Sequence, residues 1–142
     1  MLVAEILKEK GHEVWSVAPD LPLTDACREL ERRRVGAVIV CESDRVVGVL
    51  SERDVVRALA LGGEAALRRP VSDYMTAEVV FAAPTETVGM LMQRMTERRI
   101  RHLPVLADGR LAGVVSIGDV VKRQIDEATR EAESLRTYIA AG

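Results

Sequence analysis

The chain has 142 residues, of which 48% are apolar, 30% are charged and 3% are aromatic, a composition typical of a folded domain rather than a disordered tail. Lys and Arg number 20 and Asp and Glu 22, so the formal net charge of -2 provides no whole-molecule field to attract nucleic acid. The apolar runs are far shorter than the roughly 20 residues needed to cross a bilayer. We therefore expect neither a nucleic-acid partner nor a membrane partner.

The start of the chain and its cysteines bear on the cellular compartment. Residues 1–8 mix acidic, basic and apolar side chains and lack the order of a signal peptide, so we predict a cytoplasmic protein. Cys27 and Cys41 both lie in apolar surroundings. Because a reducing cytosol argues against a disulfide between them, we interpret both as buried small hydrophobic residues.

An internal repeat organises the chain. A shift of 65 positions places residues 33–35 on 98–100 and residues 48–56 on 113–121, and the register holds without a gap from Val14 to Val56. Most of the non-identical pairs exchange one apolar residue for another. A unit of about 60 residues with so few strands buries too little apolar surface to be stable alone. We therefore expect the two copies to pack sheet against sheet.

The repeat divides the chain into three parts. We place the first copy at residues 1–69 and the second at residues 70–124. Residues 3–7 and 71–75 lead the two copies as short helices or turns. Residues 125–142 are predicted to form a C-terminal amphipathic helix that contacts another surface or a second copy. The apolar residues near one face of this helix are Ile125, Ala132, Leu135 and Ile139.

Each copy predicts the order strand, helix, strand, strand, helix. In the first copy, residues 14–17 are β-prone, and a helix with one buried stripe follows. A hairpin with strands at 37–41 and 46–50 comes next, and residues 51–61 form the second helix. The stripe of the first helix recurs at helical spacing at Leu23, Ala26, Cys27 and Leu30.

The second copy repeats this order. Residues 79–82 form its first strand, a polar turn at 107–110 closes its hairpin, and its last helix begins at Ser116 and continues into the tail. The buried stripe of its first helix consists of Val88, Leu91, Met92 and Met95.

The polar motif Ser-x-x-Asp occurs once in each copy, as Ser51 with Asp54 and as Ser116 with Asp119. One interpretation is a capping box at the start of the second helix. The other is a ligand site, because a hydroxyl at a helix N-terminus suits a phosphate and an aspartate one turn later can accept hydrogen bonds from vicinal ribose hydroxyls.

These residues resemble a tandem pair of CBS domains, also called a Bateman module. The resemblance covers roughly residues 3–124, and its most specific parts are residues 48–56, 99–105 and 113–121. It implies an α+β fold in which two βαββα repeats pack as a pseudo-two-fold pair, followed by a C-terminal helix. Two clefts between the sheets would bind adenine nucleotides or related adenosyl ligands.

The resemblance also implies roles for single residues. In that family the motif aspartate holds the ribose hydroxyls and the serine approaches the phosphate, which implies these roles for Asp54 and Ser51 and for Asp119 and Ser116. The segments implied to line the base and phosphate ends contain Gly36, Ala37, Val38, Arg101, His102, Leu103 and Pro104.

The two copies differ in charge near the expected phosphate. Arg101 and His102 stand in the second copy where the first has two small residues, and Arg53 has a glycine as its counterpart. We hypothesise that Arg53, Arg101 and His102 converge on a phosphate in the central cleft, so that the second-copy site binds AMP, ADP, ATP or NAD(H) more tightly. The alternative is that Arg101 and His102 are solvated residues at a strand edge.

Trp15 is the single tryptophan of the sequence. The resemblance places it near the base of the ligand, whereas its position on the first predicted strand is equally consistent with core packing.

Catalytic signatures are missing: no phosphate-binding loop, dinucleotide fingerprint, zinc-protease or hydrolase motif occurs, and neither Ser51 nor Ser116 has an evident base. We therefore predict a regulatory, ligand-sensing homodimer that is not an enzyme and needs no cofactor or metal, with an adenine nucleotide as its regulatory ligand. The alternative is a structural dimerisation module without a physiological nucleotide. No protein partner is indicated.

Overall fold

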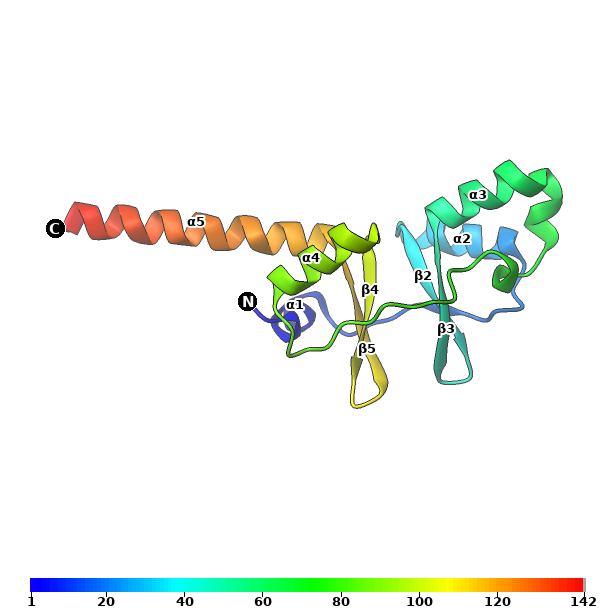
Figure 1. Cartoon of the computed structure of the whole chain (residues 1–142), viewed down its shortest axis with the longest axis horizontal. Helices are drawn as coiled ribbons and strands as arrows, with labels where there is room; N and C mark the ends of the chain where they lie inside the picture. The colour runs from blue at the N-terminus through cyan, green and yellow to red at the C-terminus, as the bar shows by residue number, and fades with distance from the viewer. Residues whose placement is uncertain (142) are drawn as a thin grey trace. The chain divides into compact units, whose positions relative to one another are not determined.

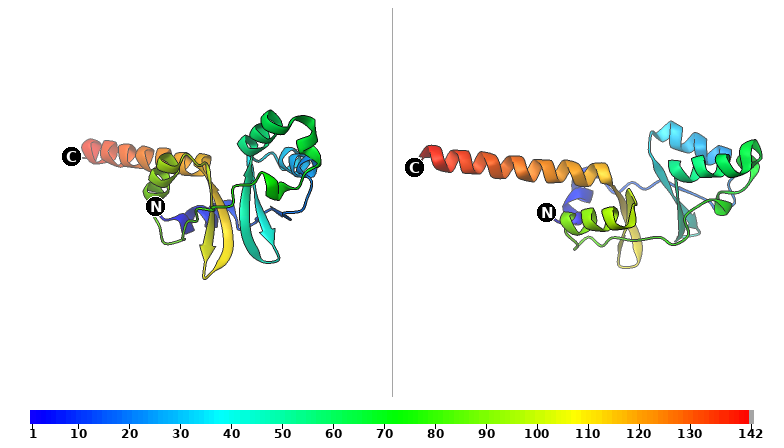
Figure 2. Two further views of the ribbon diagram at one scale, coloured as in Figure 1. Left: turned by 45° about the vertical axis from the view of Figure 1, so that its right-hand side comes forward. Right: turned by 45° about the horizontal axis from the view of Figure 1, so that its top comes forward.

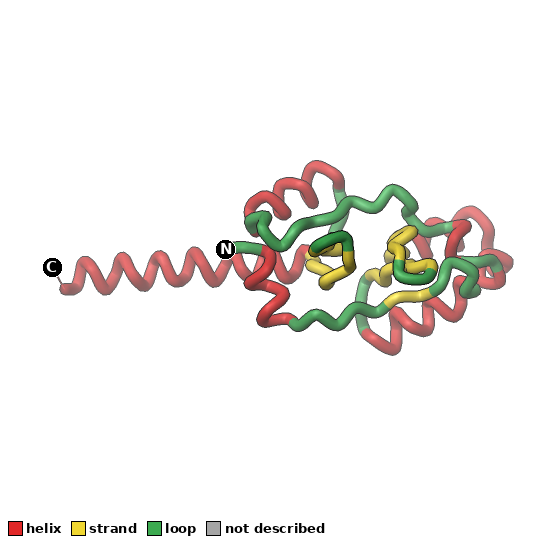
Figure 3. Tube along the Cα trace, turned by 90° about the horizontal axis from the view of Figure 1, so that it is seen from below, coloured by secondary structure: helices red, strands yellow, loops and turns green. Residues whose placement is uncertain are grey.

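The structure is a computed structural model that describes residues 1–141, and the chain forms two compact units (Figure 1). The middle unit is residues 14–80, and the terminal unit combines residues 1–13 with the chain from Phe81 onward. The chain passes between the units in two loop segments, around residues 13–14 and 80–81 (Figure 3). Both units mix helices with a small sheet, which confirms the predicted α+β class.

The middle unit contains a three-stranded sheet. β1 (Ser16–Val17) pairs in parallel with β2 (Ala37–Glu42), which forms an antiparallel hairpin with β3 (Arg45–Ser51). The helical segments are α2 (Leu23–Arg33), α3 (Glu52–Gly62) and the short 3-10 helices η1 (Gly63–Arg68) and η2 (Val71–Asp73). The predicted hairpin and both predicted helices are therefore confirmed.

One hydrophobic cluster joins the sheet of the middle unit to its helices. Side chains from α2 meet side chains from β2, β3 and α3 there, because the stripe at helical spacing on α2 faces the inward positions of the hairpin. The buried members are Leu23, Ala26, Leu30, Val38, Val40, Leu50, Ala58, Ala66 and Val71.

The two cysteines of the middle unit are free thiols, as predicted, but they are half-buried rather than buried. Burial raises the pKa of Cys27 and of Cys41 above the ordinary thiol value. Both groups are therefore held in the thiol form at neutral pH, which suits a packing role better than a reactive one.

The terminal unit is built on a two-stranded hairpin. β4 (His102–Ala107) pairs antiparallel with β5 (Arg110–Ser116), and α1 (Val3–Lys10) and α4 (Val88–Arg98) complete the unit together with α5 (Ile117–Ala141). The C-terminal helix predicted for residues 125–142 is the continuation of α5 as far as Ala141, and residue 142 lies outside the described residues.

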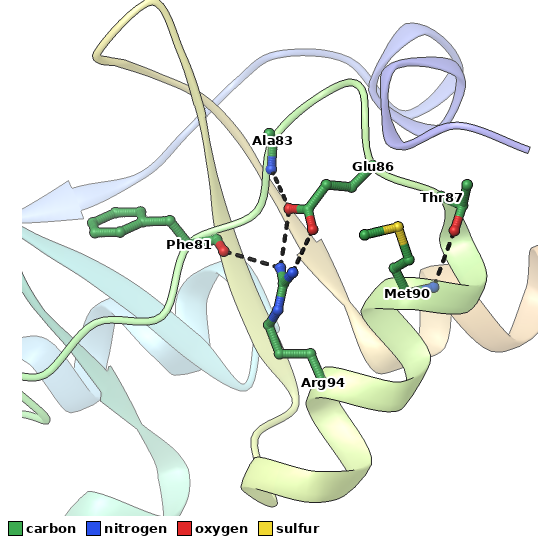
Figure 4. Close-up of polar contacts among 6 residues, drawn as sticks. All are labelled: Phe81, Ala83, Glu86, Thr87, Met90 and Arg94. Carbon is green, nitrogen blue, oxygen red and sulfur yellow. Dashed lines mark hydrogen bonds and ion pairs between the residues drawn. The ribbon is translucent and has the colours of Figure 1, made fainter.

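The strand predicted at residues 79–82 is reduced to one parallel bridge between Ala82 and Val105. Beside this bridge, the Arg94 guanidinium donates to the Phe81 carbonyl at 3.1 Å (Figure 4). Arg94 also pairs with Glu86, and this hydrogen bond is the main reason that the pKa of Glu86 lies below its ordinary value. The contacts of Arg94 and Glu86 therefore hold this segment next to the two backbone hydrogen bonds that Ala82 makes with β4.

The leading segment of each sequence repeat packs on the hairpin of the other repeat. Leu7 of α1 lies so close to Gly113 of β5 that a Cβ at this glycine would be 2.6 Å from Leu7 Cδ2. In the middle unit, the same ideal Cβ on Gly48 of β3 would be 2.6 Å from Met75 Sδ, and Thr76 forms a bridge with Val49. A side chain at either glycine would therefore force Leu7 or Met75 to move where the leading segments pack on the hairpins.

Replacing Gly113 by Ala is expected to lower the free energy of unfolding by about 1–3 kcal/mol, because the added methyl group overpacks against Leu7. The matched control is Gly89→Ala on the exposed side of α4, where the added methyl group meets only the Thr87 hydroxyl at 3.9 Å. This control should raise stability by about 0.5–1 kcal/mol. Urea denaturation of the three proteins measures both changes. Equal effects of the two substitutions would contradict the close contact at Gly113.

Candidate functional site

Both Ser-x-x-Asp motifs form capping boxes at the corner between hairpin and helix. In the middle unit, the Ser51 N–H donates to Asp54 Oδ2 at 2.9 Å, and the Asp54 N–H donates to Ser51 Oγ at 3.2 Å. Ser116 and Asp119 repeat both hydrogen bonds at 2.9 and 3.2 Å in the terminal unit. The capping interpretation is confirmed in both copies, and each pair uses Oδ2 and leaves Oδ1 of the aspartate outside the box.

A backbone hydrogen bond ties each capped helix to the start of its hairpin. The Glu52 N–H donates to the Gly36 carbonyl at 3.0 Å, and the Ile117 N–H donates to the Arg101 carbonyl at 2.8 Å. Together with the capping bonds, these contacts occupy two of the N–H groups of the first turn. Fewer backbone donors therefore face an anion here than at an uncapped helix N-terminus.

Strand register places the other predicted site positions beside the motif serines. Ala37 pairs with Ser51, and His102 pairs with Ser116, so each hairpin begins directly opposite its motif. Val38 and Leu103, one position further, are buried in the core, and Pro104 is buried as well. These three residues can therefore offer a ligand little more than their backbone.

Asp54 is 6% exposed, and its Oδ1 has only distant partners. The Thr76 hydroxyl lies 3.5 Å from this oxygen, and Arg57 Nη1 lies 4.0 Å away on an exposed side chain. Since both distances are long for a hydrogen bond, this oxygen is held weakly by the protein.

Asp119 has a strong partner that the sequence reasoning did not find. Lys10 Nζ lies 2.6 Å from Asp119 Oδ2 and also donates to the Val114 carbonyl at 2.8 Å. Burial alone would raise the pKa of Asp119, but the hydrogen bonds from Lys10 and from the Ser116 backbone outweigh it, so the pKa lies below its ordinary value. Lys10 sits where the first copy carries extra residues, so the repeat offered no counterpart that would have drawn attention to it.

The predicted cations belong to different units. Arg53 is exposed on α3 of the middle unit, whereas Arg101 is exposed and His102 is half-buried at the start of β4 in the terminal unit. The convergence of the three side chains on one phosphate therefore stays a prediction.

Trp15 does not belong to the hydrophobic core, since its side chain is 45% exposed. The guanidinium carbon of Arg33 lies 3.6 Å from the centroid of the indole ring, which is a cation–π contact within the middle unit. The core-packing alternative for this residue is therefore wrong.

Among the described residues, no group of three or more His, Cys, Asp or Glu side chains is placed to hold a metal ion. Within the same part of the chain, no helix has the length and apolar character of a membrane span.

The fold and the two capped corners define a protein made of two repeated α+β units. The chain belongs to the CBS domain family, whose model matches residues 3–61 and 71–126. It is 33% identical, over 99% of its length and 72% of the relative, to the mitochondrial CBS domain-containing protein CBSX3 of Arabidopsis thaliana.

Solved structures agree with this assignment. The CBS-domain-containing protein ATU1752 of Agrobacterium tumefaciens has a TM-score of 0.86 and 42% identity, and the match covers 87% of this chain and 99% of that one. The CBS domain protein PAE2072 of Pyrobaculum aerophilum, solved in complex with AMP, has a TM-score of 0.74 and 28% identity over 84% of this chain and 89% of its own.

Replacing Lys10 by Met is expected to raise the pKa of Asp119, because burial remains while the main stabilising cation is lost. In the wild type the lowered pKa contributes stability above the unfolded-state value, and this contribution disappears as the pH falls through the folded-state pKa. Since Lys10 is 40% exposed, the ion pair should add less than about 1 kcal/mol at neutral pH. NMR titration of the Asp119 carboxyl carbon measures the shift.

The control for this experiment is Lys8→Met, which makes the same chemical change on the same helix. An Asp119 pKa that responds equally to both substitutions would show that Lys10 is not the cause of the depression.

Proposed function

We propose that this protein is a stand-alone regulatory CBS pair that binds an adenine nucleotide, AMP, ADP, ATP or NAD(H), through its two Ser-x-x-Asp corners. The observation that carries the proposal is that each capping box uses Oδ2 of its aspartate and leaves Oδ1 outside the box. A capped aspartate of this kind is fixed in orientation and can still accept hydrogen bonds from ribose hydroxyls. The AMP complex of the relative from Pyrobaculum aerophilum supports the class of ligand.

The capping geometry also gives the serines a role. Because Ser51 Oγ and Ser116 Oγ accept the N–H of their aspartates, each hydroxyl proton is left to donate to a phosphate oxygen. His102 begins the strand opposite Ser116 and Arg101 directly precedes it, whereas the first copy has only Gly36 and Ala37 in the same place. We therefore assign the tighter phosphate binding to the second-copy corner.

Trp15 is assigned to the base of the ligand, and the backbones of Val38, Leu103 and Pro104 to the walls of the sites. Arg53, on the second helix of the first copy, is assigned as a third cation that binds the phosphate together with Arg101 and His102. Binding regulates the protein if the ligand has different affinities for two arrangements of the chain or of its homodimer. The proposal includes a cytoplasmic, non-catalytic homodimer that requires no cofactor.

A structural dimerisation module is the second candidate function. Each motif aspartate already has a structural role as the acceptor of a capping box, and Lys10 pairs with Asp119 without any ligand, which favours the second candidate. The two candidates differ in whether a nucleotide stabilises the protein.

Thermal unfolding with AMP, ATP, NADH and S-adenosylmethionine tests the proposal. A ligand at 100 times its dissociation constant should add about 2.7 kcal/mol to the free energy of unfolding. Asp119→Asn retains a capping oxygen but places an amide where the ribose needs an acceptor, so it should weaken binding about tenfold or more while the free protein stays folded. Trp15 fluorescence provides a second readout.

The control is Asp108→Asn in the exposed turn between β4 and β5, which should leave the affinity unchanged. Stability that does not respond to any of the four ligands up to millimolar concentration would favour the dimerisation module.

Replacing Arg101 by Ala is expected to weaken AMP binding at low salt and to leave adenosine binding nearly unchanged, because the substitution removes a charge near the phosphate only. Arg98→Ala, also exposed and at the end of α4, is the matched control. Titration calorimetry at two salt concentrations measures the effect. Unchanged AMP affinity in Arg101→Ala would contradict the phosphate role of this residue.

A further inference from the structure

Helix α5 has two sections with different surroundings. Its first turns pack within the terminal unit, where Val120 and Arg123 are buried and Arg123 pairs with Glu9. The N-terminal amino group contacts Glu127 at 3.0 Å on the same side of the helix. From residue 128 to 141 every residue is exposed, and Figures 1 and 2 show this section extending beyond α1 and α4.

An apolar stripe runs along the exposed side of α5. Its larger members are 42% exposed at Val121, 60% at Ile125 and Leu135, and 67% at Ile139. With two alanines between them, they are spaced alternately four and three residues apart, which is the seam of a two-stranded coiled coil. The six seam positions are Val121, Ile125, Ala128, Ala132, Leu135 and Ile139.

We propose that α5 pairs with α5 of a second copy of this chain in a parallel two-stranded coiled coil. Charge complementarity favours a second copy of the chain as the partner and a parallel orientation of the two helices. A row of side chains flanks the seam on each side: the residues of one row are neutral or basic, and the other row contains Glu131. In a parallel pair, Glu131 of each copy lies opposite Arg136 of the second copy, whereas an antiparallel pair would set Lys122 against Arg136. The first row is Lys122, Thr129 and Arg136, and the other is Gln124, Glu131 and Tyr138.

The size of the seam sets the strength of the pairing. The seam from residue 121 to residue 139 is slightly shorter than three full heptads. Ala128 and Ala132 at its centre bury little surface, although they allow the helices to approach closely. The dimer should therefore depend on protein concentration. It requires no nucleotide, so this inference stands or falls separately from the proposed ligand site.

Sedimentation velocity of the full chain over a range of concentrations tests the seam. Leu135→Glu should raise the dissociation constant of the dimer about tenfold or more, because it places a charge in the seam of both helices. Thr137→Glu adds the same charge on the opposite side of α5 and should leave the dissociation constant unchanged. Circular dichroism verifies that both variants remain folded.

Charge exchange tests the orientation. Glu131→Arg and Arg136→Glu should each weaken self-association, because each variant alone faces like charges across the seam. An equimolar mixture of the two should restore the dimer, since the arginine introduced in one variant then lies opposite the glutamate introduced in the other. A wild-type chain that stays monomeric, a dimer insensitive to Leu135→Glu, or a mixture that does not recover would each overturn the proposal.

Discussion

The hydrogen bond from the motif serine N–H to the aspartate Oδ2 fixes the corner where each hairpin becomes a helix. Because this corner is rigid, the neighbouring contacts follow: the next N–H reaches the carbonyl at the start of the hairpin, and strand pairing sets that start opposite the serine. The same carboxylate thus lies where a strand ends and a helix begins, and its other oxygen stays outside the capping box. Structural and ligand-binding interpretations of the motif are therefore compatible, because they use different atoms of one side chain.

The two corners are alike in backbone geometry and differ in what faces the carboxylate. Asp54 has the neutral Thr76 hydroxyl at a long distance, whereas Asp119 has the Lys10 ammonium in a short ion pair. Thr76 and Lys10 both lie at the end of a leading segment, and each leading segment packs on the hairpin of the other repeat. A small difference in the leading segment therefore changes the electrostatic surroundings of one carboxylate while both capping boxes keep the same geometry.

Periodicity and the internal repeat were enough to predict the hairpins, the buried helix stripes and the capping boxes, since these depend on neighbouring residues. The ends of α2 and α4 were harder to place, because Arg34 and Arg99 adopt the left-handed conformation with no glycine to mark it. Pairing of Lys10 with Asp119 depends on residues more than 100 positions apart. Aligning one copy with the other shows which residues correspond, but not which hairpin a leading segment covers.

The packing of α1 against β5 has a consequence for synthesis of the protein on the ribosome. The middle unit is complete once residue 80 has emerged, whereas α1 is made earlier and must wait for β5 before its buried face is covered. Contacts this distant in sequence close slowly. Helix α1 therefore packs only after β5 has been made, and until then its apolar residues have no hairpin to cover them.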